Sequence, residues 1–278
     1  MTILSKTAML AVSAVALLAT AGAGSAATLE QIRESGTIRI AVANEIPYGY
    51  VDPNGEAKGA GPDVAKALMK EIGIERIEWV ATNFSSLIPG LKADRFDMVA
   101  AEMAVLPDRC NQVLFSVPNT SYGEGLLVAE GNPKDIHAYA DFAAKPDLKV
   151  AIMAGADQLE MMQKLGVSEG NLVTIASNAD AISTVSTGRA DAYAATSLTV
   201  SGLAQQGRGV EVAADFSDPV IDGEPVRSWC AFTFANGNEG LRDAVNEALA
   251  QFKQTPEWAS VVSGYGFTKA DIDGSNKF

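Results

Sequence analysis

The stretch of sequence that decides the fold runs from Phe84 to Val128. Its five blocks are FSSLIPGLKADRFD at 84–97, MVAA at 98–101, LPDR at 106–109, VLFSVP at 113–118 and YGEGLLV at 122–128. In order, they predict a helix over 85–92, a buried strand over 96–101, a loop that carries Arg109, and a crossing segment. A helix followed directly by an apolar strand is typical of α/β proteins, so the flanking chain should alternate in the same way.

Strand and helix patterns do alternate on both sides of this stretch. Short apolar runs predict strands, and apolar residues at helical spacing predict helices, the first of which should stop at Gly73. The predicted strands are 38–42, 77–80, 149–153 and 173–175, and the predicted helices are 63–72, 158–165, 180–187 and 240–252. This alternation predicts an α/β fold with mainly parallel strands.

One helix–turn–strand unit occurs twice. Residues 88–97, IPGLKADRFD, match residues 182–191, ISTVSTGRAD, at an offset of 94 residues. Both segments begin with isoleucine, carry an apolar residue at the fourth position, and end in an arginine and an aspartate that flank one residue. Chance similarity of two α/β units is one explanation. Two lobes of related build are the explanation we prefer.

The amino terminus has the features of an export signal. Lys6 is the only charged residue before Glu30, and an apolar run follows it over 8–18. This run is too short for a membrane span, which needs about 20 apolar residues. The small residues at 25–27 offer a cleavage site, so we predict a signal peptide over 1–27, with cleavage after Ala26 as the alternative. No cysteine lies near this site to carry a lipid. The sequence predicts a soluble protein of the periplasm.

Composition excludes two classes of partner. The 278-residue chain has a formal net charge of −13, and 47% of its residues are hydrophobic. The hydrophobic share is ample for two sizeable cores. An acidic chain repels nucleic acid and anionic lipid, so we expect neither as a partner.

Taken together, the blocks over 84–128 resemble family 3 of the periplasmic solute-binding proteins, which feed polar amino acids and related solutes to ABC importers. The resemblance implies a two-lobe periplasmic binding fold of type II with a two-strand hinge. It places residues 28–117 and 231–278 in one lobe and residues 118–230 in the other. It also implies a small solute and an ABC permease as partners, a monomer, and no cofactor or metal.

The two cysteines, Cys110 and Cys230, leave two alternatives open. An even pair in an oxidising compartment can form a disulfide. Two separate buried thiols are the alternative, because free cysteine packs like a small hydrophobic residue. The resemblance places both residues beside the crossovers, near enough in space for either outcome.

Three residues, Arg109, Tyr48 and Phe84, match the binding positions of the family, and Glu45 lies in the same loop as Tyr48. The resemblance implies that Arg109 forks onto the ligand carboxylate, since two parallel N–H groups match two carboxylate oxygens. Without the resemblance, the sequence would favour a surface arginine at the start of a helix. Glu45 and Tyr48 follow the first predicted strand, where α/β proteins bind ligands. Tyr48 and Phe84 match the family's two aromatic positions and could cover a flat cation, or they are core aromatics.

Other positions depart from the amino-acid binders of the family. Those proteins carry an aspartate that holds the ligand's α-ammonium where this chain has Thr196. Their Ser/Thr-rich stretch before the arginine is replaced by a segment containing Ala104, without a hydroxyl, and their frequent threonine is Ala156 here. These changes imply a ligand that keeps a carboxylate and lacks a primary ammonium. Asp157 is either a residue of the site or a helix N-cap.

Within the family, the chain resembles the ectoine/hydroxyectoine-binding subunits. The similar segments are 44–45, 59–64 and 122–128. The resemblance implies that Glu45 hydrogen-bonds a ring amidinium, that Tyr48 and Phe84 cover its faces, and that Arg109 takes the carboxylate. These subunits should offer a further aromatic residue near Ala104, and this chain has none.

Two other functions compete with this interpretation. A binder of ordinary polar amino acids is the first alternative, and a dehydratase of small cyclic acids, known among relatives of the family, is the second. The sequence gives little support to an enzyme, because His137 is the only histidine and neither a G-x-S-x-G motif nor a Cys/His metal spacing occurs. We therefore expect a binding protein.

Overall fold

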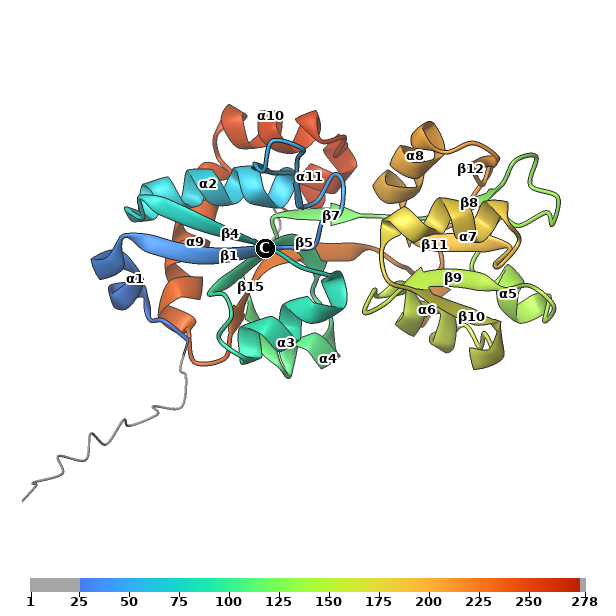
Figure 1. Cartoon of the computed structure of the whole chain (residues 1–278), viewed down its shortest axis with the longest axis horizontal. Coiled ribbons are helices and arrows are strands. Elements are labelled where there is room, and N and C mark those ends of the chain that lie inside the picture. Colours follow the sequence, from blue (N-terminus) through green and yellow to red (C-terminus); the bar gives the residue numbers. More distant parts are fainter. Residues whose placement is uncertain (1–25, 276–278) are drawn as a thin grey trace, which may run out of the picture.

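The molecule is a two-lobed α/β protein in which each lobe is built around its own sheet (Figure 1). The structure is a computed structural model that describes residues 26–275. The predicted signal peptide, residues 1–27, therefore lies almost wholly outside the described residues. Within residues 26–275, every helix is too short or too polar to cross a membrane.

The sheet of the first lobe contains six strands. These are β1 (Thr37–Val42), β4 (Arg76–Ala81), β5 (Met98–Ala104), β6 (Val113–Phe115), β7 (Thr120–Tyr122) and β15 (Ser228–Ala235). Their order is β4-β1-β5-β15-β6, with β7 also paired to β15. Strands β1, β4 and β5 are parallel, so the loops that follow them meet at one edge of the sheet.

Helices cover both faces of this sheet. They are α1 (Leu29–Ser35), α2 (Ala60–Ile72), α3 (Leu87–Lys92), α4 (Pro107–Cys110), α9 (Glu239–Phe252), α10 (Pro256–Gly264) and α11 (Lys269–Ser275), with a hairpin of β2 (Tyr50–Val51) and β3 (Ala57–Lys58). Helix α2 buries Val64 and Leu68 and ends at Gly73, whose φ of 83° is the left-handed conformation that glycine adopts at low cost. The predicted stop of this helix is confirmed.

The second lobe repeats the layered arrangement. Its strands are β8 (Glu124–Ala129), β9 (Val150–Met153), β10 (Leu172–Ile175), β11 (Ala192–Thr196) and β12 (Val210–Val212). The order is β10-β9-β11-β8-β12, with β9, β10 and β11 parallel. The helices and short turns are α5 (Asp141–Ala144), α6 (Gln158–Lys164), η2 (Glu169–Asn171), η3 (Asn178–Asp180), α7 (Ala181–Ser186) and α8 (Ser197–Gln206), and β13 (Val220–Ile221) pairs with β14 (Glu224–Pro225).

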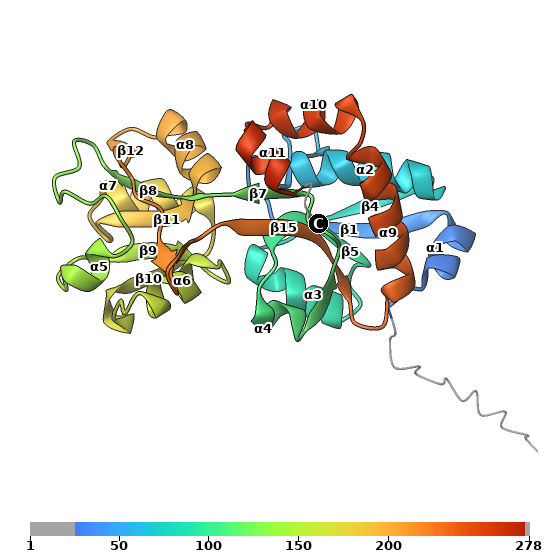
Figure 2. The same ribbon diagram turned by 180° about the vertical axis from the view of Figure 1, so that it is seen from behind.

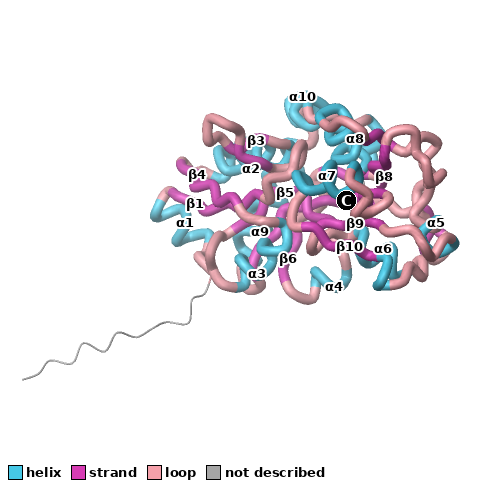
Figure 3. The backbone as a smooth tube through the Cα atoms, turned by 45° about the vertical axis from the view of Figure 1, so that its right-hand side comes forward, coloured by secondary structure: helices cyan, strands magenta, loops and turns pink. Residues whose placement is uncertain are grey.

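Both sheets are buried on both faces, as parallel sheets usually are. In the first lobe Ile40 packs into the core beneath α2 and α9, while Val99 packs into the core beside α3. In the second lobe Leu126 and Leu127, adjacent on β8, belong to different cores. Figure 3 shows the result, with strands inside each lobe and helices outside.

Two extended segments join the lobes (Figure 2). The first passes from β7, which pairs with β15 in one sheet, directly into β8, which pairs with β11 in the other. The second is β15 and the chain leading into it. Helix α11 lies against this connection, where the Ser121 hydroxyl donates to the Asp271 carbonyl at 3.1 Å. The predicted two-lobe fold with a two-strand hinge is confirmed.

The structure decides two predictions about this lobe, the extent of one strand and the state of the two cysteines. The predicted strand over 96–101 instead runs from Met98 to Ala104, because it gains backbone partners on β15 as far as the pair Ala104–Cys230. Cys230 is buried and Cys110 is exposed, and both thiols are free. The disulfide is therefore not formed in this structure, and the alternative of two buried thiols holds for Cys230 but not for Cys110.

Candidate functional site

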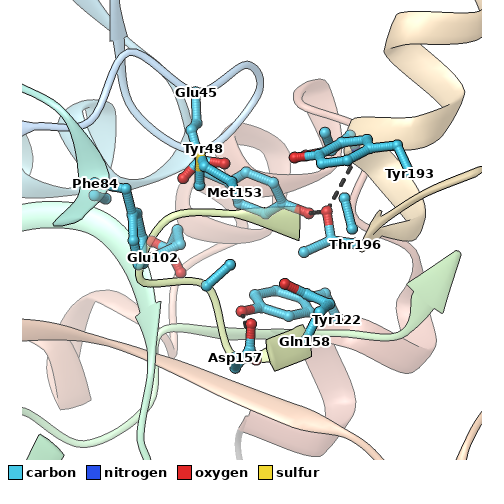
Figure 4. Close-up of a pocket in the computed structure, with 14 residues that line it drawn as sticks. Glu45, Tyr48, Phe84, Glu102, Tyr122, Met153, Asp157, Gln158, Tyr193 and Thr196 are labelled. Atoms are coloured by element: carbon cyan, nitrogen blue, oxygen red, sulfur yellow. Dashed lines mark hydrogen bonds between the residues drawn. The ribbon is translucent and has the colours of Figure 1, made fainter. Parts of the chain in front are cut away.

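A small cavity lies between the lobes (Figure 4). Its wall is formed by Glu45, Tyr48, Phe84, Ala101, Glu102, Tyr122, Met153, Ala156, Asp157, Gln158, Tyr193, Ala195, Thr196 and Thr199. Most of these residues lie at or just beyond the carboxyl ends of β1, β4, β5, β9 and β11. This edge of a parallel sheet is where α/β proteins bind ligands, and here two such edges face each other.

Glu45 brings a carboxylate into the cavity from the first lobe. It sits in a tight loop after β1, where its backbone N–H and carbonyl both bond to Gly49, at 3.0 and 2.8 Å. Its Oε1 accepts a hydrogen bond from Asn178 Nδ2 of the second lobe at 2.9 Å. Burial of the carboxyl, and the charge of Asp157, raise its pKa to about 7, although Asn178 and Arg109 both favour the ionised form. Glu45 can therefore be charged or neutral near neutral pH.

Tyr48 reaches across the cavity from the same loop. Its hydroxyl donates to Thr196 Oγ1 of the second lobe at 2.5 Å, and Thr196 also caps α8 by accepting from Thr199 N at 3.2 Å. The Tyr48 ring packs edge-on against Tyr122 and Phe267, with centroid separations of 5.6 and 5.8 Å. Tyr48 is therefore both a packed core aromatic and part of the cavity wall, so features of both predicted alternatives are present.

Arg109 lies behind the cavity wall. Its Nη1 donates to the Ala104 carbonyl at 2.8 Å and its Nη2 donates to the Gly155 carbonyl of the second lobe at 2.9 Å. Its guanidinium carbon lies 5.6 Å from the centroid of the Phe84 ring, which itself lines the cavity. A guanidinium has five N–H donors, so two bonds to carbonyls leave donors for a ligand carboxylate. The surface-arginine alternative is wrong, because Arg109 is buried.

Two further predicted residues, Ala104 and Asp157, contribute to the site in different ways. Ala104 is buried in β5 away from the cavity and contributes its carbonyl, as the acceptor for Arg109. Asp157 lines the cavity and accepts hydrogen bonds from Ser228 Oγ at 2.9 Å and from the Tyr122 hydroxyl at 3.3 Å. Asp157 occupies the N-cap position of α6, as the alternative predicted, but its side chain makes no capping bond and faces the cavity instead.

Glu102 is a cavity residue that sequence reasoning missed. It is 4% exposed, and its oxygens accept from Asn119 Nδ2 and from Thr120 Oγ1, both at 2.6 Å. Burial raises the pKa of this carboxyl. Its φ of 48° is uncommon for a residue other than glycine, asparagine or aspartate. No signal in the sequence marks this position, because the backbone conformation is set by the sheet around it.

The cavity wall is rich in carboxyl groups, and burial raises the pKa of Glu45, Glu102 and Glu124. Glu45, Glu102 and Asp157 line the cavity, and Glu124 lies behind Gln158, whose Nε2 donates to Glu124 Oε2 at 2.7 Å. Such a wall suits a ligand with a cationic group. Within residues 26–275, no cluster of histidine, cysteine and carboxylate side chains is arranged to hold a metal ion.

Comparison with known proteins agrees with this architecture. The model of the bacterial extracellular solute-binding proteins, family 3, matches residues 38–268. A relative from Sinorhizobium fredii, named as a probable amino-acid ABC transporter periplasmic-binding protein (y4tE), is 53% identical over 262 residues, covering 94% of this chain and 87% of the relative.

Two solved structures show the same fold at high similarity. The structure of EhuB in complex with hydroxyectoine has a TM-score of 0.81 and 29% identity, covering 90% of this chain and 95% of EhuB. The ancestral amino acid-binding protein AncCDT-1, a precursor of cyclohexadienyl dehydratase, has a TM-score of 0.75 and 30% identity, covering 87% of this chain and 100% of that one. With the family match over most of its length, this chain belongs to family 3 of the bacterial extracellular solute-binding proteins and is a solute-binding subunit of an ABC transporter, not an enzyme.

Proposed function

We propose that this protein binds a small zwitterionic compatible solute of the ectoine class in the periplasm and delivers it to an ABC permease. The observation that carries the proposal is the Glu45 carboxylate, which faces a cavity lined by the aromatic rings of Tyr48 and Phe84. A carboxylate beside aromatic faces suits a delocalised ring cation such as an amidinium. Arg109 lies behind Phe84 with donors for the carboxylate of the same ligand.

Closure of the lobes around the solute completes the proposed function. We assign residues 28–117 and 231–278 to one lobe and residues 118–230 to the other, with the hinge in the crossing segments, where β7 and residues 228–230 of β15 still pair within the sheet of the first lobe. Arg109, Glu45 and Tyr48 each contact the opposite lobe directly, so closure assembles the site from both halves. Closure also excludes water, which strengthens charged contacts inside the cavity, and gives the permease a distinct shape to bind. We expect the protein to act as a monomer.

The second candidate is a binder of ordinary polar amino acids. Asp157 favours it, because this buried carboxylate lines the cavity and could hold an α-ammonium that Thr196 cannot. The Sinorhizobium fredii relative carries an amino-acid transporter name. Against it, Asp157 already accepts hydrogen bonds from Ser228 and Tyr122, both beside the hinge.

A thermal-shift experiment separates the two candidates. The chain without residues 1–27 is heated with ectoine, hydroxyectoine, glutamate, lysine or histidine. A ligand at about 100 times its Kd stabilises the protein by about 2.7 kcal/mol, which raises the Tm of a domain of this size by about 5–10 °C. We expect this rise with ectoine or hydroxyectoine alone. If the Tm rises with glutamate, lysine or histidine and does not rise with ectoine or hydroxyectoine, the second candidate is established instead.

A further inference from the structure

One hydrogen bond across the cavity involves a residue of the second lobe that contacts Glu45. Asn178 opens the short turn η3 before α7, 133 residues along the chain from Glu45. Its Nδ2 lies 2.9 Å from Glu45 Oε1. The contact joins the loop after β1 to the other lobe, so it exists only while the lobes are closed.

Tyr193 fixes the direction of this hydrogen bond. Tyr193, on β11, is 1% exposed, and its hydroxyl donates to Asn178 Oδ1. Figure 4 shows Tyr193 on the wall of the cavity, on the side of Thr196. Because the amide oxygen is occupied by Tyr193, the amide nitrogen is turned toward Glu45. An N–H donor favours a carboxylate over a protonated carboxylic acid at that position.

Some of the other groups around Glu45 raise its pKa and others lower it. Burial and the negative charge of Asp157 disfavour the carboxylate, and the more distant guanidinium of Arg109 favours it. The balance leaves the pKa of Glu45 at about 7, and Asn178 is the strongest of the groups that hold it down. Glu45 thus stays half-ionised at neutral pH largely because Asn178 donates to it.

We propose that Asn178, oriented by Tyr193, is a positioning residue that keeps Glu45 charged and correctly turned when the lobes close on the ligand's cation. This inference rests on the proposed function, which pairs Glu45 with that cation. Closing the cavity removes water from the Glu45 carboxylate at the moment when the cation needs its charge. Asn178 arrives from the second lobe at that same step and replaces a lost water hydrogen bond. Solute affinity is thereby tied to proton binding at Glu45.

The test is the pH profile of solute binding, measured by calorimetry with ectoine between about pH 6 and pH 9.5. In the unaltered protein, affinity falls up to tenfold for each pH unit below about 7, because protonation of Glu45 removes the partner of the cation. Asn178→Ala should move this fall to higher pH, so that affinity drops about tenfold at pH 7.5 and recovers to within about twofold near pH 9.5. Asn178→Asp, of equal size, should move it further, since a second carboxylate opposes ionisation.

Matched controls separate positioning from a general structural role. Asn171→Ala removes another asparagine of the second lobe, whose Nδ2 bonds only to the carbonyls of Pro146 and Leu148, and should leave the pH profile unchanged. Tyr193→Phe should shift the profile in the same direction as Asn178→Ala but less. Glu45→Gln should abolish the fall near pH 7. An equal loss of affinity for Asn178→Ala at every pH would overturn the proposal.

A second measurement decides the matter even if ectoine does not bind, and it uses whichever solute raises the Tm in the thermal-shift experiment, because a bound solute holds the lobes closed and keeps Asn178 beside Glu45. The carboxyl carbon of Glu45 can be titrated by NMR in protein labelled with ¹³C-glutamate, with the resonance assigned by its loss in Glu45→Gln. We expect its midpoint to be higher in Asn178→Ala than in the unaltered protein. Equal midpoints contradict the role of Asn178. A difference without ectoine binding supports that role while refuting the proposed solute.

Discussion

The two helix–turn–strand units, α3–β5 and α7–β11, are built alike and end differently. In both, the backbone N–H of the arginine bonds to the carbonyl five residues earlier, from Arg95 to Gly90 and from Arg189 to Thr184, each at 3.0 Å. In both, the aspartate two residues further on accepts a backbone N–H at 2.8 Å, Asp97 from Arg39 on β1 and Asp191 from Lys149 just before β9. The shared part fixes the turn and the start of the strand.

The difference begins where the strands reach the cavity. Strand β5 continues through Glu102, with its unusual backbone, to the segment that carries Arg109. Strand β11 stops at Thr196, whose hydroxyl caps α8 and meets Tyr48. One unit thus delivers charged groups to the site and the other delivers a neutral hydroxyl. In this repeated scaffold the side chains of the site lie toward the carboxyl ends of the strands, where residues can differ between the two units without disturbing the shared turn.

The largest effect should come from the charged end of the first unit. Arg109→Ala should weaken ectoine binding by about 2–5 kcal/mol, because a desolvated carboxylate loses its charged partner. Arg109→Lys should also bind poorly, since an ammonium cannot form the fork. Arg189→Ala is the matched control, because this exposed arginine of the second unit bonds to Thr184 outside the cavity. Calorimetry that finds similar affinity for Arg109→Ala and Arg189→Ala would show that the units do not differ in this way.

A smaller effect should come from the shared aspartates, and it should appear in stability rather than binding. Asp97 is 2% exposed and also pairs with the Arg39 guanidinium at 2.7 Å, whereas Asp191 is only partly buried. Asp97→Ala should lower the free energy of unfolding by about 1.5–3 kcal/mol and Asp191→Ala by about 0.5–1.5 kcal/mol. Urea denaturation measures both. A loss of solute affinity in either variant, with stability intact, would contradict their assignment to the scaffold.

Most of the scaffold could be predicted because its signals are local. Apolar spacing marks α2, and the glycine at its end marks the stop, so both follow from residues that are neighbours in the sequence. The repeated unit was visible for the same reason, since Asp97 and Asp191 keep a fixed distance from their helices. The extension of β5 to Ala104 was not visible, because it depends on pairing with β15, more than a hundred residues away.

The sequence predicted the residues of the site better than it predicted their contacts. Five of the seven predicted residues line the cavity, and the other two, Ala104 and Arg109, contact each other just behind it. The resemblance to a family supplied these positions. It could not supply the bond from Asn178 to Glu45 or the backbone of Glu102, because both arise from packing between segments distant in the sequence. Their role in binding stays a prediction for the mutants described above.

The smallest effect tests the neutral end of the second unit, through Tyr48. Tyr48→Phe removes the hydroxyl that bonds to Thr196 and keeps the ring, so ectoine affinity should fall by about 0.5–1.5 kcal/mol. Tyr48→Leu removes the ring as well, and it should lose a further 1–2 kcal/mol or so if the ring covers the ligand's cation. Thr196→Val removes the same bond from the other lobe, and a double-mutant cycle with Tyr48→Phe isolates the bond from the lost cap of α8. If Tyr48→Leu binds ectoine as tightly as Tyr48→Phe, the ring serves packing against Tyr122 and Phe267 alone, and the cation is held by Glu45 without an aromatic face at Tyr48.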